Sequence, residues 1–79
     1  MEKMFKTVTL ESGVVVEQLE GSVRIAECPP HGFVHVAQPG GGITPLEKGK
    51  TYEGEVVVEE GSLFLEQGGR RVLLGRVAP

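Results

Sequence analysis

Alternating apolar and polar positions dominate the C-terminal third of the chain. Between Gly54 and Val77, three strand-length apolar runs are separated by two short turn signals, Glu60-Gly61 and Gly68-Gly69. Two-residue loops of this kind connect antiparallel strands and fix their pairing. The segment is therefore predicted to form a three-stranded antiparallel meander. One face of this meander carries Val56, Val58, Leu63, Leu65, Val72 and Leu74.

The opposite face of the meander is predicted to be half apolar. Side chains alternate between the two faces of a strand, and the expected pairing places Val57, Phe64 and Leu73 in one row across the three strands. A second row holds Glu55, Glu66 and Arg71, and Glu66 directly opposes Arg71 in it. The apolar row needs cover, either from the first half of the chain or from another subunit.

The first half of the chain predicts four further strands. They cover residues 4–10, 14–19, 22–28 and 33–37, and glycine or proline turn signals separate them. A two-residue turn at Glu20-Gly21 would place Val16 opposite Ile25 and Glu17 opposite Arg24. Residues 38–50 are predicted to be irregular, and residues 51–59 are predicted to form the strand that opens the meander.

Seven short strands without a helix predict an all-β fold, either a small antiparallel barrel or a two-sheet sandwich built from meanders. A chain of 79 residues is long enough for one domain only, so residues 1–79 are taken as a single unit. A shift of forty residues aligns Glu20, Gly21 and Ser22 with Glu60, Gly61 and Ser62. Residues 13–37 and 53–77 are therefore candidate copies of a duplicated unit, unless two hairpins with the same turn simply look alike.

The charge and composition narrow the class of protein. The net charge is −3, from eleven acidic and eight basic residues, so nothing attracts a nucleic-acid backbone strongly. Every acidic residue is glutamate, and the chain contains no aspartate, asparagine or tryptophan. This composition is typical of thermophile proteins and predicts a thermostable domain, although sampling in a short chain is the alternative explanation.

The single cysteine, Cys28, excludes an internal disulfide and fits a reducing compartment. The longest unbroken apolar runs are three residues, so no membrane span is expected, and residues 1–10 lack the apolar core of a signal peptide. We therefore expect a cytoplasmic protein. Because so short a chain has a small core, we also expect a homo-oligomer with Val57, Phe64 and Leu73 as its contact face.

Cys28, His31 and His35 have the spacing C-x2-H-x3-H and are the only thiol and imidazole groups of the chain. Three such ligands can hold zinc or copper. The stretch resembles the ligand loop of type 1 copper proteins, but Val34 stands where that family has an axial methionine, and no histidine precedes Cys28. We expect no cofactor. The alternative function is that of a small metal- or ligand-binding protein that uses Cys28, His31 and His35.

The segment from residue 38 to residue 50 is the first choice for a binding loop, because long irregular segments in compact domains usually bind something. Its candidate binding residues are Pro39, Gly40, Gly41, Gly42, Ile43 and Thr44. The glycines do not lead into a helix start, which argues against a phosphate cradle.

The chain offers little for catalysis or nucleic-acid binding. Its three serines lie at turns without a histidine nearby in the sequence, and its four aromatic residues are dispersed. We therefore expect a protein that is not an enzyme and does not bind nucleic acid. The pattern favours a self-associating β module that presents loops to a protein partner, as a structural or regulatory component.

Overall fold

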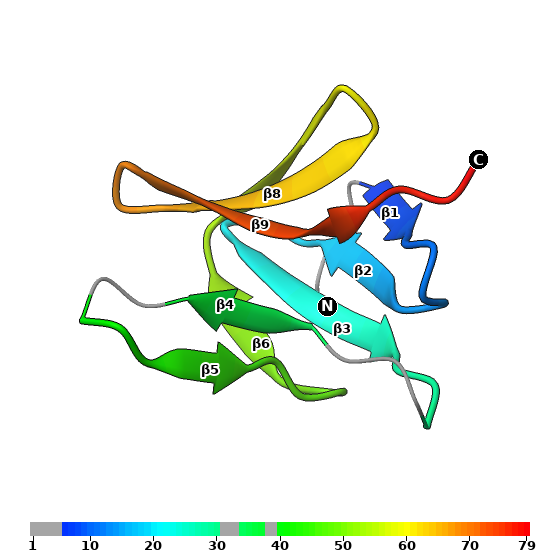
Figure 1. The fold of residues 1–79 in the computed structure, drawn as a ribbon, viewed down its shortest axis with the longest axis horizontal. Helices are drawn as coiled ribbons and strands as arrows, with labels where there is room; N and C mark the ends of the chain where they lie inside the picture. Colours follow the sequence, from blue (N-terminus) through cyan, green and yellow to red (C-terminus); the bar gives the residue numbers. More distant parts are fainter. Residues whose placement is uncertain (1–5, 31–33, 38–39) are drawn as a thin grey trace.

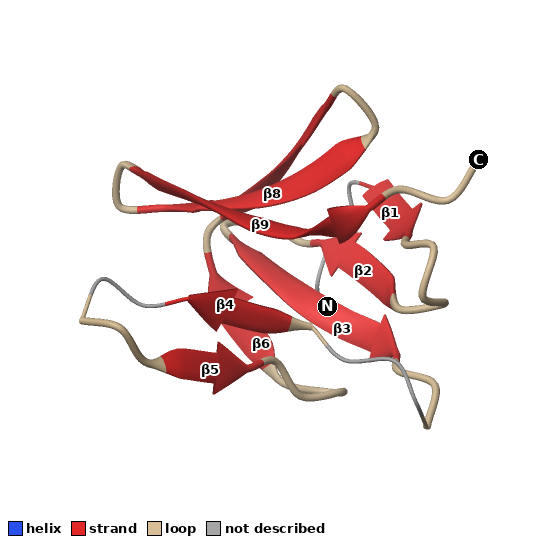
Figure 2. Cartoon of the chain, in the orientation of Figure 1, coloured by secondary structure: helices blue, strands red, loops and turns tan. Residues whose placement is uncertain are grey.

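The computed structural model describes residues 6–30, 34–37 and 40–79. Within these residues the chain forms nine β-strands and no helix (Figures 1 and 2). The strands are β1 (Lys6–Thr9), β2 (Val15–Gln18), β3 (Ser22–Glu27), β4 (His35–Ala37), β5 (Ile43–Pro45), β6 (Thr51–Glu53), β7 (Glu55–Glu59), β8 (Ser62–Gln67) and β9 (Arg70–Arg76). The predicted all-β class is confirmed, with two strands more than the seven predicted.

The strands belong to three sheets, and every strand pairing within them is antiparallel. A four-stranded sheet has the order β1-β2-β3-β6, a three-stranded sheet has the order β7-β8-β9, and β4 pairs with β5. In Figure 1, β8 and β9 lie above β2 and β3 in the view. The two larger sheets form a sandwich-like fold, and the strands do not close into the barrel that was the other expectation.

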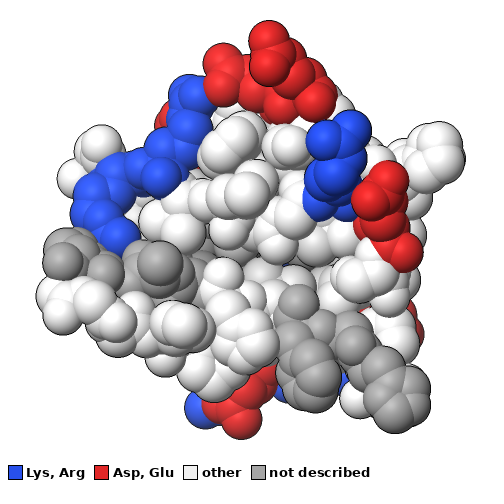
Figure 3. Space-filling view, in the orientation of Figure 1, with Lys and Arg blue, Asp and Glu red and all other residues white. Residues whose placement is uncertain are grey.

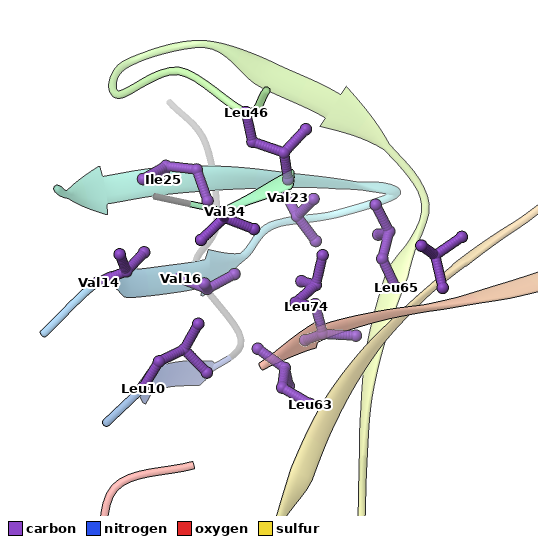
Figure 4. Close-up of a cluster of buried hydrophobic side chains, with 12 residues drawn as sticks. Leu10, Val14, Val16, Val23, Ile25, Val34, Leu46, Leu63, Leu65 and Leu74 are labelled. Carbon is purple, nitrogen blue, oxygen red and sulfur yellow. The ribbon is translucent and has the colours of Figure 1, made fainter. Parts of the chain in front are cut away.

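Buried side chains from both larger sheets form one core between them (Figure 4). The cluster contains Leu10, Val14, Val16, Val23, Ile25, Val34, Leu46, Val56, Leu63, Leu65, Val72 and Leu74. The members of this cluster that lie on β2, β3, β8 and β9 occupy alternate positions along their strands, because one face of each strand points inward. The core thus holds together sheets that are far apart in the sequence.

The predicted pairing of β2 with β3 is confirmed. Val16 lies opposite Ile25, and Glu17 lies opposite Arg24. The Arg24 guanidinium donates a hydrogen bond of 3.0 Å from Nε to the Glu17 carboxylate. In the meander the predicted row of Val57, Phe64 and Leu73 is also confirmed.

Val58 does not belong to the buried face, contrary to the sequence prediction. Its side chain is 45% exposed, whereas Val56 on the same strand is buried. Val58 lies near the turn between β7 and β8, and Figure 1 shows that this hairpin end projects beyond the four-stranded sheet. Alternation therefore gave the correct face for Val58, but no core lies beneath it.

The predicted strand over residues 51–59 is divided at Gly54, which corrects the sequence prediction. β6 pairs with β3 in one sheet, and β7 pairs with β8 in the other. Gly54 has a φ of +135°, and a Cβ atom there would lie 2.5 Å from the backbone oxygen of Glu66. The chain crosses between the sheets at this residue because only glycine tolerates that conformation so close to another strand.

The segment predicted to be irregular contains a short strand, β5. Residues Ile43 to Pro45 pair with β4, so that Val36 lies opposite Thr44. Leu46, directly after β5, donates a backbone hydrogen bond of 2.9 Å to Val34 and is buried in the core. This anchor explains why the segment forms a hairpin instead of a loose connector. The described residues contain no helix long and apolar enough to cross a membrane.

Candidate functional site

The surface of the β7–β8–β9 sheet that points away from the core is the candidate site and is called the outer face below. Its nine side chains form three rows across the strands. Row 1 is Glu55, Glu66 and Arg71, row 2 is Val57, Phe64 and Leu73, and row 3 is Glu59, Ser62 and Arg76. β7 thus supplies an acidic edge (Glu55 and Glu59), and β9 supplies a basic edge (Arg71 and Arg76).

Row 2 is the apolar part of the outer face, and the core does not cover it. Leu73 is 54% exposed. Val57 and Phe64 are half-buried, yet neither belongs to the side chains that pack against the core cluster. Among the described residues, the core therefore does not extend over row 2, and cover from another subunit stays a prediction.

A register shift between Leu63 and Phe64 brings Arg76 onto the outer face. Because of this shift, Leu63 lies opposite Gly75, and Ser62 lies opposite Arg76. Gly75 points inward, where an added Cβ atom would lie 3.3 Å from Leu10. A β-bulge changes which side chains face outward beyond it. Simple alternation from Arg71 and Leu73 would have placed Gly75 outside and Arg76 inside.

Arg71 spans the outer face above Phe64. Its guanidinium donates hydrogen bonds of 3.0 Å and 2.7 Å to the Glu66 carboxylate and also pairs with Glu59 two strands away. The Arg71 carbon Cζ lies 5.7 Å from the centre of the Phe64 ring, within range of a cation–π contact. The hydrogen bond to Glu66, followed by the charge of Glu59, raises the pKa of Arg71 above its ordinary value.

Two charges on the outer face have no ion pair with any residue that the structure describes. Glu55 lies directly opposite Glu66, so that two carboxylates are cross-strand neighbours. Arg76 is exposed at the opposite corner of the sheet. Like charges in directly opposite positions repel, and Arg71 neutralises only Glu66 of this pair. The outer face therefore leaves one acidic and one basic group available for an external partner.

A shallow groove of about 440 Å³ lies at the row 1 end of the outer face. It is lined by Glu55, Glu66, Gly68, Gly69, Arg70 and Arg71. Figure 3 shows uncharged surface lying between Lys and Arg side chains on two sides and Asp and Glu side chains at the top of the view. Polar groups of both signs line this groove, and the uncharged row 2 runs beside it.

The predicted binding loop lies in the β4–β5 hairpin. Gly40, Gly41, Gly42, Ile43 and Thr44 are all exposed, and Ile43 is 68% exposed. Pro39 lies outside the described residues. The hairpin belongs to a different sheet from the outer face, so the two candidate surfaces are separate features of the molecule.

The predicted metal ligands are only partly described. Cys28 is half-buried and packs against the core, whereas His35 is exposed on β4. His31 lies outside the described residues. No group of three potential ligands occurs among the residues that are described. The complete set of Cys28, His31 and His35 therefore stays a prediction.

Sequence reasoning missed the buried side chain of Gln18. It is only 7% exposed and hydrogen bonds to four backbone groups. The signal was present, because Gln18 continues the inward phase of Val14 and Val16. A polar residue in the phase of the core must find hydrogen-bond partners there.

Comparison of the chain with protein-family models, with curated proteins and with solved structures gives no significant match. The function is therefore inferred from the residues and geometry described above.

Proposed function

We propose that this protein is a non-enzymatic β module that associates with copies of itself through the outer face and presents the β4–β5 hairpin to a protein partner. It would act as a structural or regulatory component in the cytoplasm. The observation that carries the proposal is row 2, where Val57, Phe64 and Leu73 align across three strands without cover from the core. Aligned apolar side chains on a sheet surface gain free energy when another surface removes them from water.

The surroundings of row 2 support a protein surface as the cover. Rows 1 and 3 flank the apolar row with charged groups, which is the arrangement of an interface with an apolar centre and a polar rim. Phe64 and the arginines are residue types that commonly dominate such interfaces. The single cysteine, Cys28, supports the cytoplasmic assignment.

The size of the outer face sets the expected strength of association. Three strands about 4.8 Å apart and five residues rising about 3.3 Å each span on the order of 250 Å². A stable complex buries about 800 Å² per partner. Association through the outer face alone is therefore expected to be reversible and dependent on concentration.

The β4–β5 hairpin supports the second part of the proposal. Ile43 exposes more of its surface than any other large apolar side chain among the described residues. It lies on a short strand whose far edge carries no further strand within its sheet. An exposed apolar side chain on an open hairpin is a suitable contact for a protein partner.

The test is sedimentation velocity of the wild-type protein over a wide concentration range, beside two matched variants. Leu73→Ser removes an exposed apolar side chain from the outer face, and Ile43→Ser removes one from the hairpin. We expect the wild type and Ile43→Ser to associate equally, and Leu73→Ser to associate at least about tenfold more weakly. A wild type that stays monomeric, or equal association of all three proteins, would contradict the proposal.

A further inference from the structure

We propose that two copies meet outer face to outer face about a two-fold axis that runs parallel to β8, with the acidic edge of each copy over the basic edge of the other. This inference rests on the proposed function and adds the symmetry of the contact. It follows from the distribution of charge over the three rows, which is not symmetric.

A two-fold axis parallel to the strands and one across the strands stack identical sheet faces in different ways, and they exchange different features. A two-fold axis parallel to the strands exchanges β7 with β9 and keeps each row opposite itself. A two-fold axis across the strands keeps each strand opposite itself and exchanges row 1 with row 3. Both are isologous contacts, in which the same surface of each copy meets its counterpart.

The charges distinguish these two arrangements. With the axis parallel to β8, Glu55 faces Arg71 of the partner subunit, and Glu59 faces Arg76 of the partner subunit. With the axis across the strands, Glu55 faces Glu59 of the partner subunit, and the two arginines face each other as well. Like charges brought together at an interface cost free energy, whereas opposite charges favour the complex. Of these two arrangements, the outer face therefore fits the axis parallel to the strands.

The parallel axis also supplies partners to the two charges that the single molecule leaves without one. Glu55 gains Arg71 of the partner subunit, and Arg76 gains Glu59 of the partner subunit. Glu66 meets its own counterpart on the axis, but each Glu66 carboxylate keeps its own Arg71 at 2.7 Å. All five charged side chains of each outer face then have an opposite charge nearby. Glu59 is shared between its own Arg71 and Arg76 of the partner subunit, and Arg71 is shared among Glu59, Glu66 and Glu55 of the partner subunit.

The apolar row fits the same arrangement. Phe64 lies in the middle of row 2, so the axis brings together the two Phe64 rings, each with its own Arg71 guanidinium over it. Val57 of each copy lies over Leu73 of the partner subunit. Pairing a smaller with a larger side chain at both ends fills the row evenly. Sheets that stack with their strands nearly parallel are a common packing mode.

Joining the sheets edge to edge is less favourable than stacking their faces. β7 is an edge strand of its sheet, and its outward side chains at both ends are glutamates. Two β7 edges paired antiparallel would bring these carboxylates together. Charged side chains on an edge strand oppose this kind of pairing.

Cysteine cross-linking separates the two axes. In a Cys28→Ala background, Ser62→Cys places a thiol on β8, which lies on the axis parallel to the strands. The same residue lies in row 3, which is away from the axis across the strands. Val57→Cys places a thiol in row 2, which lies on the axis across the strands. It also places that thiol on β7, which is away from the axis parallel to the strands. Facing sheets are roughly 10 Å apart, so a short bis-maleimide joins thiols that face each other more readily than thiols that are also offset sideways.

We expect Ser62→Cys to form cross-linked dimers at least about fivefold faster than Val57→Cys at a protein concentration where sedimentation shows dimer. Equal rates, or a faster reaction at Val57→Cys, overturn the parallel axis while the proposed self-association stands. A sedimenting dimer that cross-links at neither position overturns the outer face as the contact. A wild type without any dimer overturns the proposed function itself.

A charge-exchanged variant gives an independent readout. It carries Glu55→Arg, Glu59→Arg, Arg71→Glu and Arg76→Glu, and its fold is checked by circular dichroism. With the parallel axis, the variant associates with itself but not with the wild type, because mixing places acid over acid and base over base. Mixed dimers of labelled wild type and variant would overturn the inference. If the variant does not fold, the cross-linking result decides alone.

Discussion

The side-chain oxygen Oε1 of Gln18 accepts a hydrogen bond of 2.6 Å from the backbone amide of Val56, and this bond connects the two larger sheets. Gln18 is the last residue of β2, and Val56 lies in β7. The Gln18 amide nitrogen Nε2 donates to the carbonyl oxygens of Leu19 at 2.8 Å, Ser22 at 2.9 Å and Gly54 at 3.3 Å. One buried side chain therefore satisfies backbone groups of the turn between β2 and β3 and of the segment around Gly54, where the chain passes from one sheet to the other.

Gln18→Met is expected to lower the free energy of unfolding by about 2–4 kcal/mol. Methionine has a similar shape but cannot bond to these groups, and a buried backbone group left without a partner costs about 1–3 kcal/mol. Urea unfolding followed by circular dichroism measures the loss.

Gln67→Met is the matched control for this substitution. Gln67 also donates from Nε2 to a backbone oxygen, that of Glu53 at 2.8 Å, but the bond is exposed to water. We expect a change below about 0.5 kcal/mol, because water replaces the lost partner. Equal losses for the two variants would show that burial of the Gln18 network does not determine stability.

Local pairing was predictable from the sequence, because it depends on short turns. The turns at Glu20-Gly21 and Glu60-Gly61 connect adjacent strands, so counting outward from each turn gives the cross-strand neighbours. The apolar half of the candidate site, row 2, followed in the same way. These features depend on residues that are close in the sequence.

Features that depend on distant contacts were not predictable. Gly54 interrupts a run that reads as one continuous strand, and the reason is the backbone of Glu66 beside it. Arg76 reaches the outer face only because of the bulge opposite Leu63, where Gly75 turns inward toward Leu10. The basic edge was therefore incomplete in the sequence interpretation, since alternation cannot locate a bulge.

Gly54→Ala is expected to destabilise the fold by about 2–4 kcal/mol. The residue has a positive φ, and the new Cβ atom would lie 2.5 Å from the Glu66 oxygen. The change is measured by urea unfolding.

Two other glycines serve as controls for Gly54→Ala. Gly21 has a φ of +76° with open space around it, so Gly21→Ala is expected to cost about 1 kcal/mol from backbone strain alone. Gly40 has open space and no positive φ, so Gly40→Ala is expected to change stability little. If Gly54→Ala cost no more than Gly21→Ala, steric contact with the neighbouring strand would not be the reason for the glycine.

The composition predicts that the protein melts above about 70 °C, beyond the range of about 45–65 °C that is usual for mesophile domains. Its acidic residues are all glutamate, and it contains no asparagine. Paired charges such as Arg71 with Glu59 and Glu66 also become more favourable at high temperature, because the cost of removing charged groups from water falls. Differential scanning calorimetry at low protein concentration measures the midpoint, and a value near 50 °C would contradict the prediction.

Zinc and copper are expected to leave the melting temperature unchanged, because the proposed function requires no metal. A ligand that binds only the folded state raises the free energy of unfolding. The gain is about 2.7 kcal/mol when the ligand concentration is a hundred times the dissociation constant. A site built from Cys28, His31 and His35 would therefore give a shift that a chelator reverses. Cys28→Ala and His35→Ala identify the ligands, since each would abolish such a shift. A metal-dependent shift that both variants remove would favour the metal-binding function over self-association as the role of this chain.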